Sequence, residues 1–129
     1  MIKNKIHYIL KQNIDEILSS EDFVILFDGK KIRNKNELFR FLKETIDLPD
    51  SDNWSSIIDW LTDLSWLKAD KYAFVFDNYN SFLADDLVSK ELFLEILKEE
   101  VLPWWENDAK KYVVGGVSKS FQVYIIKND

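Results

Sequence analysis

The chain is organised around residues 48–67, which read LPDSDNWSSIIDWLTDLSWL. The first six have the composition of a loop, and the rest show the i, i+3, i+4, i+7 spacing of an amphipathic helix. The apolar side of this helix collects the residues expected to face a core: Trp54, Ile57, Ile58, Leu61 and Leu64. The other side collects Ser55, Asp59, Thr62 and Asp63, joined by Trp66 if the helix continues that far.

The polar side of this helix has two interpretations. Asp59 and Asp63 are four residues apart, and like charges at that spacing weaken an isolated helix slightly, so local helix stability does not explain them. They form either an ordinary solvated face or a surface that meets a cationic partner. Periodicity alone favours the solvated face.

The remaining elements follow from hydrophobic patterning. Continuous apolar runs predict strands over residues 23–27, 72–76 and 121–126, the first of them buried on both faces. Helical spacing predicts helices over residues 3–18 and 35–46, a short one over 82–87, and a longer one that Ser89 caps and Pro103 ends or kinks. Trp104 and Trp105 follow, either in the core or exposed, and residues 113–116 read as a break.

This alternation of helices and strands predicts an α/β fold with a three-stranded, parallel sheet packed with helices. We expect one domain over residues 1–129, with a core over residues 23–127 and an additional N-terminal helix over residues 1–20. That helix is expected to pack on the edge of the domain rather than to mediate self-association, so we expect a monomer.

The run from Phe27 to Leu64, FDGKKIRNKNELFRFLKETIDLPDSDNWSSIIDWLTDL, resembles the barstar family, the intracellular inhibitors of secreted bacterial ribonucleases. The matching pieces come in the family's order: Asp28-Gly29, a helix with Leu38, Phe41 and Leu42, Leu48-Pro49, Asn53-Trp54, and then Ile57, Asp59, Leu61 and Asp63. The resemblance implies the same architecture. It also implies a small immunity or inhibitor protein that occludes the cationic active site of a toxic nuclease with an acidic helix and the loop before it.

The resemblance also implies site residues. The aspartate that dominates binding in the family matches Asp59, and a loop asparagine matches Asn53. A family contact aspartate is replaced by Ser55, an aromatic residue by Ile58 and a glycine by Asp63. A glutamate of the fourth helix could be Glu99 or Glu100. We therefore predict a partner-binding surface of Asn53, Trp54, Ser55, Ile58, Asp59, Thr62, Asp63, Trp66 and Glu99, in which Trp66 is the better aromatic anchor because Trp54 also belongs to the apolar side.

The composition of the chain limits the kinds of partner and the cellular location that we expect. A net charge of −6 opposes binding to nucleic acid and suits a basic protein partner, here a secreted nuclease toxin. No apolar run is long enough to span a bilayer, the N-terminus does not resemble a signal peptide, and the chain has no cysteine. We therefore expect a cytoplasmic protein that binds no membrane and no cofactor.

Catalysis and metal binding lack a constellation of suitable residues. His7, the one histidine, is expected to be solvated on the N-terminal helix. Residues 50–52 begin like a calcium loop, but Trp54, Ser55 and Leu61 occupy positions that need a ligand, a glycine and a glutamate, so we predict no metal site. We expect no enzyme. A hydrolase that uses Asp59 and Asp63 is the weakest alternative, and a regulatory or scaffolding module that binds another basic protein is the stronger one.

Overall fold

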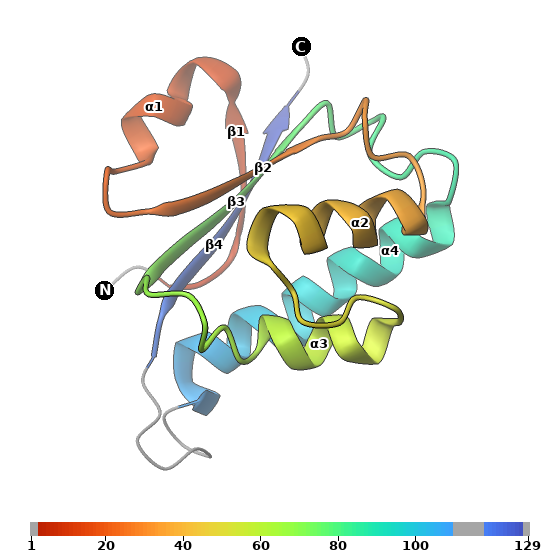
Figure 1. Cartoon of the computed structure of the whole chain (residues 1–129). Helices are drawn as coiled ribbons and strands as arrows, with labels where there is room; N and C mark the ends of the chain where they lie inside the picture. The colour runs from red at the N-terminus through yellow and green to blue at the C-terminus, as the bar shows by residue number, and fades with distance from the viewer. Residues whose placement is uncertain (1–2, 110–117, 128–129) are drawn as a thin grey trace.

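The fold is a parallel β-sheet with its longer helices on one face and a short helix near the N-terminus on the other (Figure 1). The structure is a computed structural model that describes residues 3–109 and 118–127, so the predicted break at residues 113–116 lies outside the described residues. The sheet has four strands in the order β1-β4-β3-β2. Their bounds are Ile6–Leu10 for β1, Phe23–Asp28 for β2, Lys71–Asp77 for β3 and Ser120–Lys127 for β4. The predicted α/β class and the strands over residues 23–27, 72–76 and 121–126 are confirmed.

The predicted N-terminal helix over residues 3–18 is wrong. Residues Ile6–Leu10 form β1, and only Lys11–Asn13 (η1) and Ile14–Ile17 (α1) are helical. Every residue of β1 lies opposite a residue of β4, from Ile6 beside Val123 to Leu10 beside Lys127. The edge of β4 offers hydrogen-bond partners to those backbone N–H and C=O groups of residues 6–10 that face it. This tertiary contact outweighs the weak helical propensity of the segment. The sheet therefore has a fourth strand that the sequence pattern did not predict.

The first long helix, α2 (Lys35–Ile46), follows the predicted pattern closely. The Asn34 side chain caps it by accepting a hydrogen bond from the Glu37 amide at 3.0 Å, and Asp47 ends it in the left-handed conformation, with φ 52°. Leu38, Leu42 and Ile46 are buried in the core, and Phe41 is half-buried.

The C-terminal helical segment differs from its prediction at both ends. Helix α4 (Leu87–Ile96) begins at the cap Asp86, not at Ser89, and residues 81–85 form turns in place of the predicted short helix. The chain stays helical through Pro103, with the wider π-helical turns η2 (Leu97–Val101) before it and η3 (Trp104–Asp108) after it. Pro103 therefore does not end the helix. Proline has no backbone N–H to donate within a helix, and here it lies between the two π-helical turns, where the usual α-helical hydrogen bonds are already replaced.

The core lies between the helices and one face of the sheet. Phe27 is its centre: the ring stacks on Phe76 at 4.3 Å between centroids and meets Phe74, Phe82 and Phe93 at 5.0–6.1 Å. Among the described residues, the segment from β1 to β2 covers the other face of the sheet, where Ile9, Ile14 and Leu18 pack against the buried cluster of Ala73, Val75, Tyr124 and Ile126. This cover does not reach the whole of β2, which is an edge strand.

Exposure in β2 corrects a further prediction. Val24 is 41% exposed and Leu26 is 57% exposed, whereas Ile25 and Phe27 on the other side of the strand are buried. The strand over residues 23–27 is therefore buried on one face and not on both. The apolar run alone could not distinguish an edge strand from a central strand.

Gly29 carries the chain out of β2. A Cβ atom at this position would lie 2.0 Å from the carbonyl oxygen of Asn78 and 2.7 Å from the amide of Phe82. The Asp28 carboxylate accepts hydrogen bonds from the Asn78 side chain and the Lys30 amide, both at 3.0 Å, and these bonds lower the pKa of Asp28. The Asp28-Gly29 pair thus makes a turn that leaves a parallel strand.

The cap of α4 gives a testable pH dependence. The Asp86 carboxylate accepts hydrogen bonds from the Ser89 hydroxyl at 2.6 Å and the Ser89 amide at 3.2 Å, and these bonds lower the pKa of Asp86. A carboxyl group whose pKa is lowered by folding stabilises the fold above its unfolded pKa and loses that effect as the pH falls through the folded value. We expect Asp86→Ala to cost about 0.5–2 kcal/mol at neutral pH, and the difference from wild type to shrink below pH about 4.

Urea unfolding followed by circular dichroism at neutral and acidic pH checks this expectation. Asp85→Ala is the matched control, because among the described residues the Asp85 side chain forms only an exposed ion pair with Arg33, which contributes little to stability. A cost of Asp86→Ala that stays constant across the pH range would show that the carboxylate does not carry the cap.

Candidate functional site

Helix α3 (Trp54–Leu61) is held in place at its N-terminus by the loop before it. The Asn53 side chain caps it by accepting a hydrogen bond from the Ser56 amide at 2.9 Å. Asp50 accepts bonds from the Asp52 amide at 3.0 Å and the Ser56 hydroxyl at 3.2 Å, and the first of these does most to lower the pKa of Asp50. Asn53, a predicted contact residue, is exposed. Its side-chain oxygen already accepts the hydrogen bond that caps the helix.

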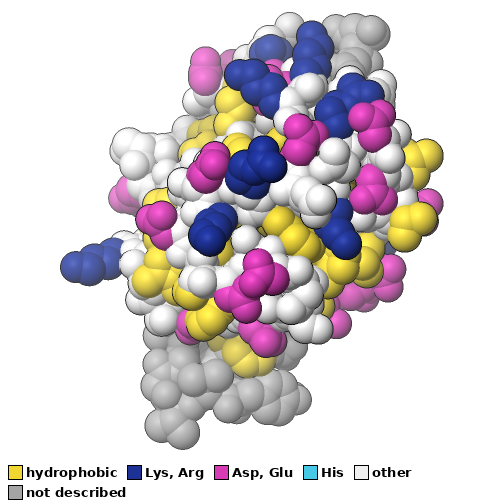
Figure 2. All heavy atoms as spheres, turned by 45° about the vertical axis from the view of Figure 1, so that its right-hand side comes forward, with side chains coloured by type: hydrophobic (Ala, Val, Ile, Leu, Met, Phe, Trp, Pro, Cys, Tyr) yellow, Lys and Arg dark blue, Asp and Glu magenta, His cyan; other side chains and the backbone are white. Residues whose placement is uncertain are grey.

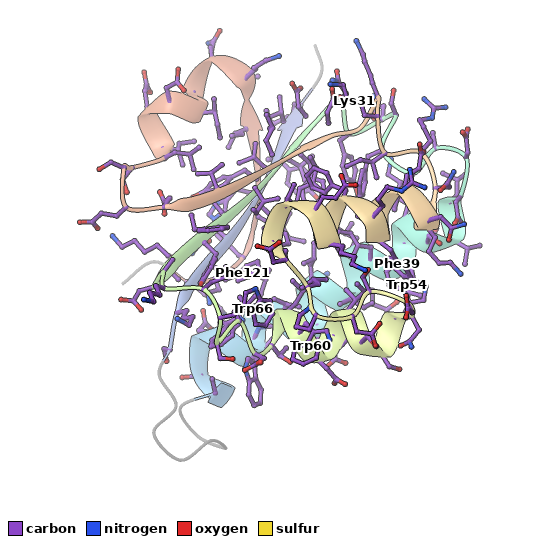
Figure 3. The ribbon with its side chains drawn as sticks, viewed as in Figure 1. Lys31, Phe39, Trp54, Trp60, Trp66 and Phe121 are labelled. Atoms are coloured by element: carbon purple, nitrogen blue, oxygen red, sulfur yellow. The ribbon has the colours of Figure 1, made fainter. Side chains whose placement is uncertain are left out.

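The apolar side of α3 packs as its spacing predicted. Ile57 and Leu61 are fully buried. Trp54 is half-buried and packs edge-on against Phe39 at 4.9 Å between ring centroids, and more loosely against Phe93 at 6.3 Å (Figure 3). Trp54 therefore belongs mainly to the core and offers only part of its ring to a partner.

The helix ends earlier than expected, and this moves two predicted contact residues. After Leu61 the chain turns: the Thr62 hydroxyl donates to the Ile58 carbonyl at 2.8 Å, and Leu64 adopts a left-handed backbone, with φ 53°, that buries its side chain. The helix therefore does not continue far enough for Trp66 to join its polar side. Asp63 lies in this turn, where its carboxylate accepts a bond from the Ser65 hydroxyl at 3.1 Å, and so does not extend the side of α3 that carries Asp59.

Trp66 is tied to the end of α2 and does not continue α3. Its indole N–H donates to the Ile46 carbonyl at 2.7 Å, and its ring packs edge-on against Trp60 at 5.8 Å. Both rings are half-buried, and they lie at the opposite end of α3 from Trp54 (Figure 3). The sequence pattern did not single out Trp60, which follows Asp59 directly.

A groove between α3 and α4 collects several predicted residues. It is a hollow of about 190 Å³ whose floor and rim, here called the α3–α4 groove, consist of Trp54, Ser55, Ile58, Leu92, Glu95, Ile96, Glu99 and Glu100. Glu99 thus lies across the groove from Ser55 and Ile58, although more than forty residues separate them in the chain. Asp59 is exposed on the same helix as Ser55, one turn further along. Glu95 and Glu100 complete the rim, and Glu95 was not predicted.

The charge around this groove has one sign. We call Asp59, Glu95, Glu99 and Glu100 the acidic face; all four are exposed, and the described residues that line the groove include no lysine or arginine. The ion pairs between described residues are Lys11–Asp77, Arg33–Asp85, Lys71–Glu21 and Lys119–Asp70, and none of them includes a member of the acidic face. Figure 2 shows lysine and arginine mostly in its upper half and acidic side chains beside hydrophobic surface at the height of α3.

The acidic face suits binding better than catalysis. Its carboxylates are open to solvent, whereas catalytic carboxylates are usually buried enough to tune their pKa. His7 lies elsewhere, on β1, where its ring nitrogen meets the Gln122 side chain at 2.7 Å and its ring stacks on Tyr124 at 4.9 Å, so the prediction of a solvated histidine on a helix is wrong. The described residues contain no cluster of histidine, cysteine, aspartate or glutamate suited to hold a metal ion.

No helix within the described residues has the length and apolar character needed to cross a membrane.

Comparison with known proteins identifies the family. The family model described as barstar (barnase inhibitor) matches residues 23–115, which span β2, α2, α3, β3, α4 and the π-helical turns. No curated protein and no solved structure matches the chain. The matched residues contain the whole α3–α4 groove, and they are most of the sequence. The chain therefore belongs to the family of barstar, the barnase inhibitor.

Proposed function

We propose that this protein inhibits a nuclease, in the first place a ribonuclease of the barnase kind, by placing its acidic face in the active site of the enzyme. The single observation that carries the proposal is the set of exposed carboxylates around the α3–α4 groove, none of them in an ion pair between described residues. Family membership supports a nuclease as the partner. The producing cell would use such a protein for immunity against its own toxin.

The mechanism follows from the chemistry of the target. A ribonuclease active site presents arginine and lysine side chains shaped around a phosphate. A carboxylate on a rigid helix accepts charge-assisted hydrogen bonds from such groups, and Asp59 stands where a phosphate would bind. The enzyme is blocked because its substrate cannot reach the cationic side chains.

The α3–α4 groove extends this contact beyond one aspartate. Ser55 replaces a charge that the family commonly carries on this helix, and it lies on the rim opposite the α4 segment. Glu95, Glu99 and Glu100 supply negative charge on that opposite rim, around an apolar floor of Ile58, Leu92 and Ile96. The groove therefore suits a long cationic side chain, which buries its aliphatic stem and keeps its charged end at the rim.

An inhibition assay tests the proposal directly. The protein is titrated into a barnase-type ribonuclease, and both RNA cleavage and the association rate are measured at low and moderate salt. We expect stoichiometric loss of cleavage and association that slows as salt rises, since a net charge of −6 speeds the encounter with a basic enzyme. Binding that leaves cleavage intact would favour the scaffolding module, and absence of binding would contradict this target.

A further inference from the structure

Strand β1 gives the sheet an open edge outside the part of the chain that defines the family. It precedes residues 23–115, and among the described residues it pairs only with β4. The Lys5 carbonyl accepts a hydrogen bond from the Val123 amide at 3.1 Å, so Lys5 turns its backbone groups towards β4. Because backbone direction alternates along a strand, the N–H and C=O groups of Ile6, Tyr8 and Leu10 turn outward. An edge of this kind is a template for another strand.

A groove runs beside this edge on the helical side of the sheet. It has a volume of about 400 Å³, and the described residues that line it, here called the β1–α4 groove, are Asn4, Lys5, Ile6, Tyr8, Leu94, Lys98 and Leu102. Its floor is apolar, and Tyr8 remains 60% exposed. A second hollow of about 310 Å³ shares Tyr8 and continues past it to Tyr79 and Lys127. Ile6 at the start of β1 packs against the core, whereas Tyr8 stays exposed to solvent.

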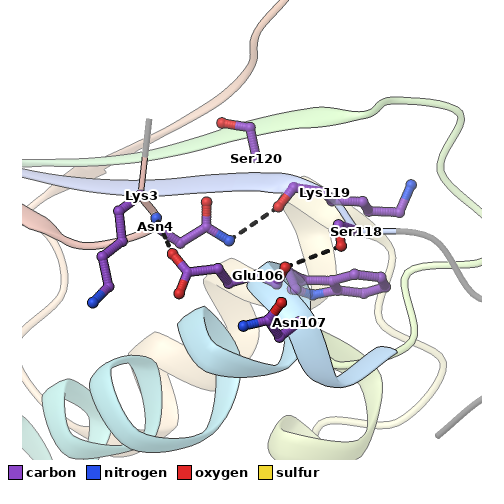
Figure 4. A pocket seen from close by; sticks show the side chains of 8 residues that line it. Lys3, Asn4, Glu106, Asn107, Ser118, Lys119 and Ser120 are labelled. Carbon is purple, nitrogen blue, oxygen red and sulfur yellow. Dashed lines mark hydrogen bonds between the residues drawn. The ribbon is translucent and has the colours of Figure 1, made fainter. Parts of the chain in front are cut away.

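The start of β1 is fixed before any partner arrives. The Asn4 amide donates to Glu106 Oε1 at 2.9 Å, and its side-chain Nδ2 donates to the Lys119 carbonyl at 3.0 Å (Figure 4). The side-chain oxygen of Asn4 accepts a bond from the Phe121 amide at 3.1 Å, and Asn4 is 9% exposed. An edge held this firmly costs a partner little ordering entropy.

We propose that the β1 edge binds an extended acidic segment of a partner protein as an added strand. The backbone of the segment pairs with the outward groups of Ile6, Tyr8 and Leu10, and alternate apolar side chains enter the β1–α4 groove. Lys5 and Lys98 are exposed on the rim, and neither takes part in an ion pair between described residues. Two exposed lysines beside this edge favour a segment that carries glutamate or aspartate.

Other occupants fit this edge less well. Nucleic acid offers no ladder of backbone N–H and C=O groups with which a strand could pair. A second copy that paired antiparallel about Tyr8 would set Lys5 opposite Lys11 of the copy, and like charges directly opposite each other destabilise a strand pair. Lys98 lines the β1–α4 groove, whereas its neighbour Glu99 lines the α3–α4 groove. The two grooves therefore lie on different sides of the same helical segment, and a basic partner and an acidic partner would not compete for one site.

Fluorescence anisotropy with a labelled Glu-Thr-Val-Thr-Val-Thr-Glu peptide, whose valines and glutamates share one face of the strand, tests the proposal on the full chain. We expect saturable binding, and slower hydrogen exchange at the amides of Ile6, Tyr8 and Leu10 when the peptide is present. Lys98→Glu should weaken binding about fivefold to tenfold, and Lys98→Arg should retain it. A peptide with lysine in place of glutamate and a peptide with N-methylated backbone amides should both fail to bind.

Several results would overturn the proposal. Absence of saturable binding would do so, as would equal binding of the N-methylated peptide, because that peptide cannot add as a strand. Protection of the same three amides that grows with protein concentration, without any peptide, would assign the edge to a second copy. If Lys98→Glu binds the peptide as tightly as wild type, the proposed recognition of an acidic segment by Lys98 is wrong.

Discussion

Replacing Asp59 with alanine is expected to weaken binding to the inhibited nuclease by about 2–5 kcal/mol, or roughly 30-fold to several thousand-fold in Kd. Asp59 is exposed on α3, and no ion pair between described residues engages its carboxylate. Once the interface excludes water, the cations of the enzyme depend on this carboxylate for compensation. Removing it leaves them buried and unpaired, which is why the expected loss exceeds that of an exposed ion pair.

Titration calorimetry with matched variants separates the direct contact of Asp59 from the effect of net charge on binding. Asp59→Asn keeps the shape of the side chain and removes its charge, so it should approach the alanine variant in effect. Asp15→Ala makes the same change of net charge in α1, on the side of the sheet away from α3, and should alter Kd little (Figure 1). Equal losses in Asp59→Ala and Asp15→Ala would mean that only the overall field matters, and no loss in either would remove Asp59 from the interface.

The second large effect is expected at Trp105, which anchors the C-terminal end of α3. Its ring is buried, and its indole N–H donates to the Leu61 carbonyl, the last residue of the helix, at 2.8 Å. Trp105→Phe keeps an aromatic ring but leaves that carbonyl without its donor, at a cost of about 1–3 kcal/mol. Trp105→Ala opens a cavity as well and should cost about 3–5 kcal/mol or more.

Guanidinium unfolding followed by far-ultraviolet circular dichroism measures these costs. Trp104→Phe is the neighbouring control, since the Trp104 indole N–H is buried and has no hydrogen-bond partner among the described residues. It should therefore cost less than Trp105→Phe. Variants of Trp105 that remain folded should inhibit the nuclease with nearly unchanged Kd, because Trp105 supports α3 and does not line the α3–α4 groove. A Trp105→Phe variant as stable as Trp104→Phe would show that the bond to Leu61 contributes nothing.

Elements with strong local signals could be predicted from the sequence. The apolar runs of β2, β3 and β4 each extend over at least five residues, and the caps Asn34 and Asn53 stand directly before the helices that they begin. The buried side of α3 followed from its spacing because the helix is short and strongly amphipathic. Asp59 followed from the same spacing, together with the resemblance to the family.

Where local signals conflict with distant contacts, the prediction failed. The spacing of Ile6, Ile9 and Leu10 fits a helix, yet these residues form β1, because the free edge of β4 offers them a complete backbone ladder. The end of α3 at Leu61 is set by burial of Leu64 and by the bond from Trp105, both of which depend on residues that helical periodicity does not consider. Periodicity left open whether α3 continues to Trp66, and the structure ends the helix earlier and gives the Trp66 indole N–H to the Ile46 carbonyl.

The sequence by itself thus determined the α/β class, the inner strands, the helices α2 and α3 and the position of Asp59 on an exposed helix face. The tertiary structure alone decided that Glu95 and Glu99 lie across a groove from Ser55, and that β1 opens a second groove with Lys98 on its rim. The physical reason is the distance along the chain over which each effect acts. Propensity, caps and periodicity act over a few neighbouring residues, whereas a surface made by two elements exists only after the core has fixed their separation.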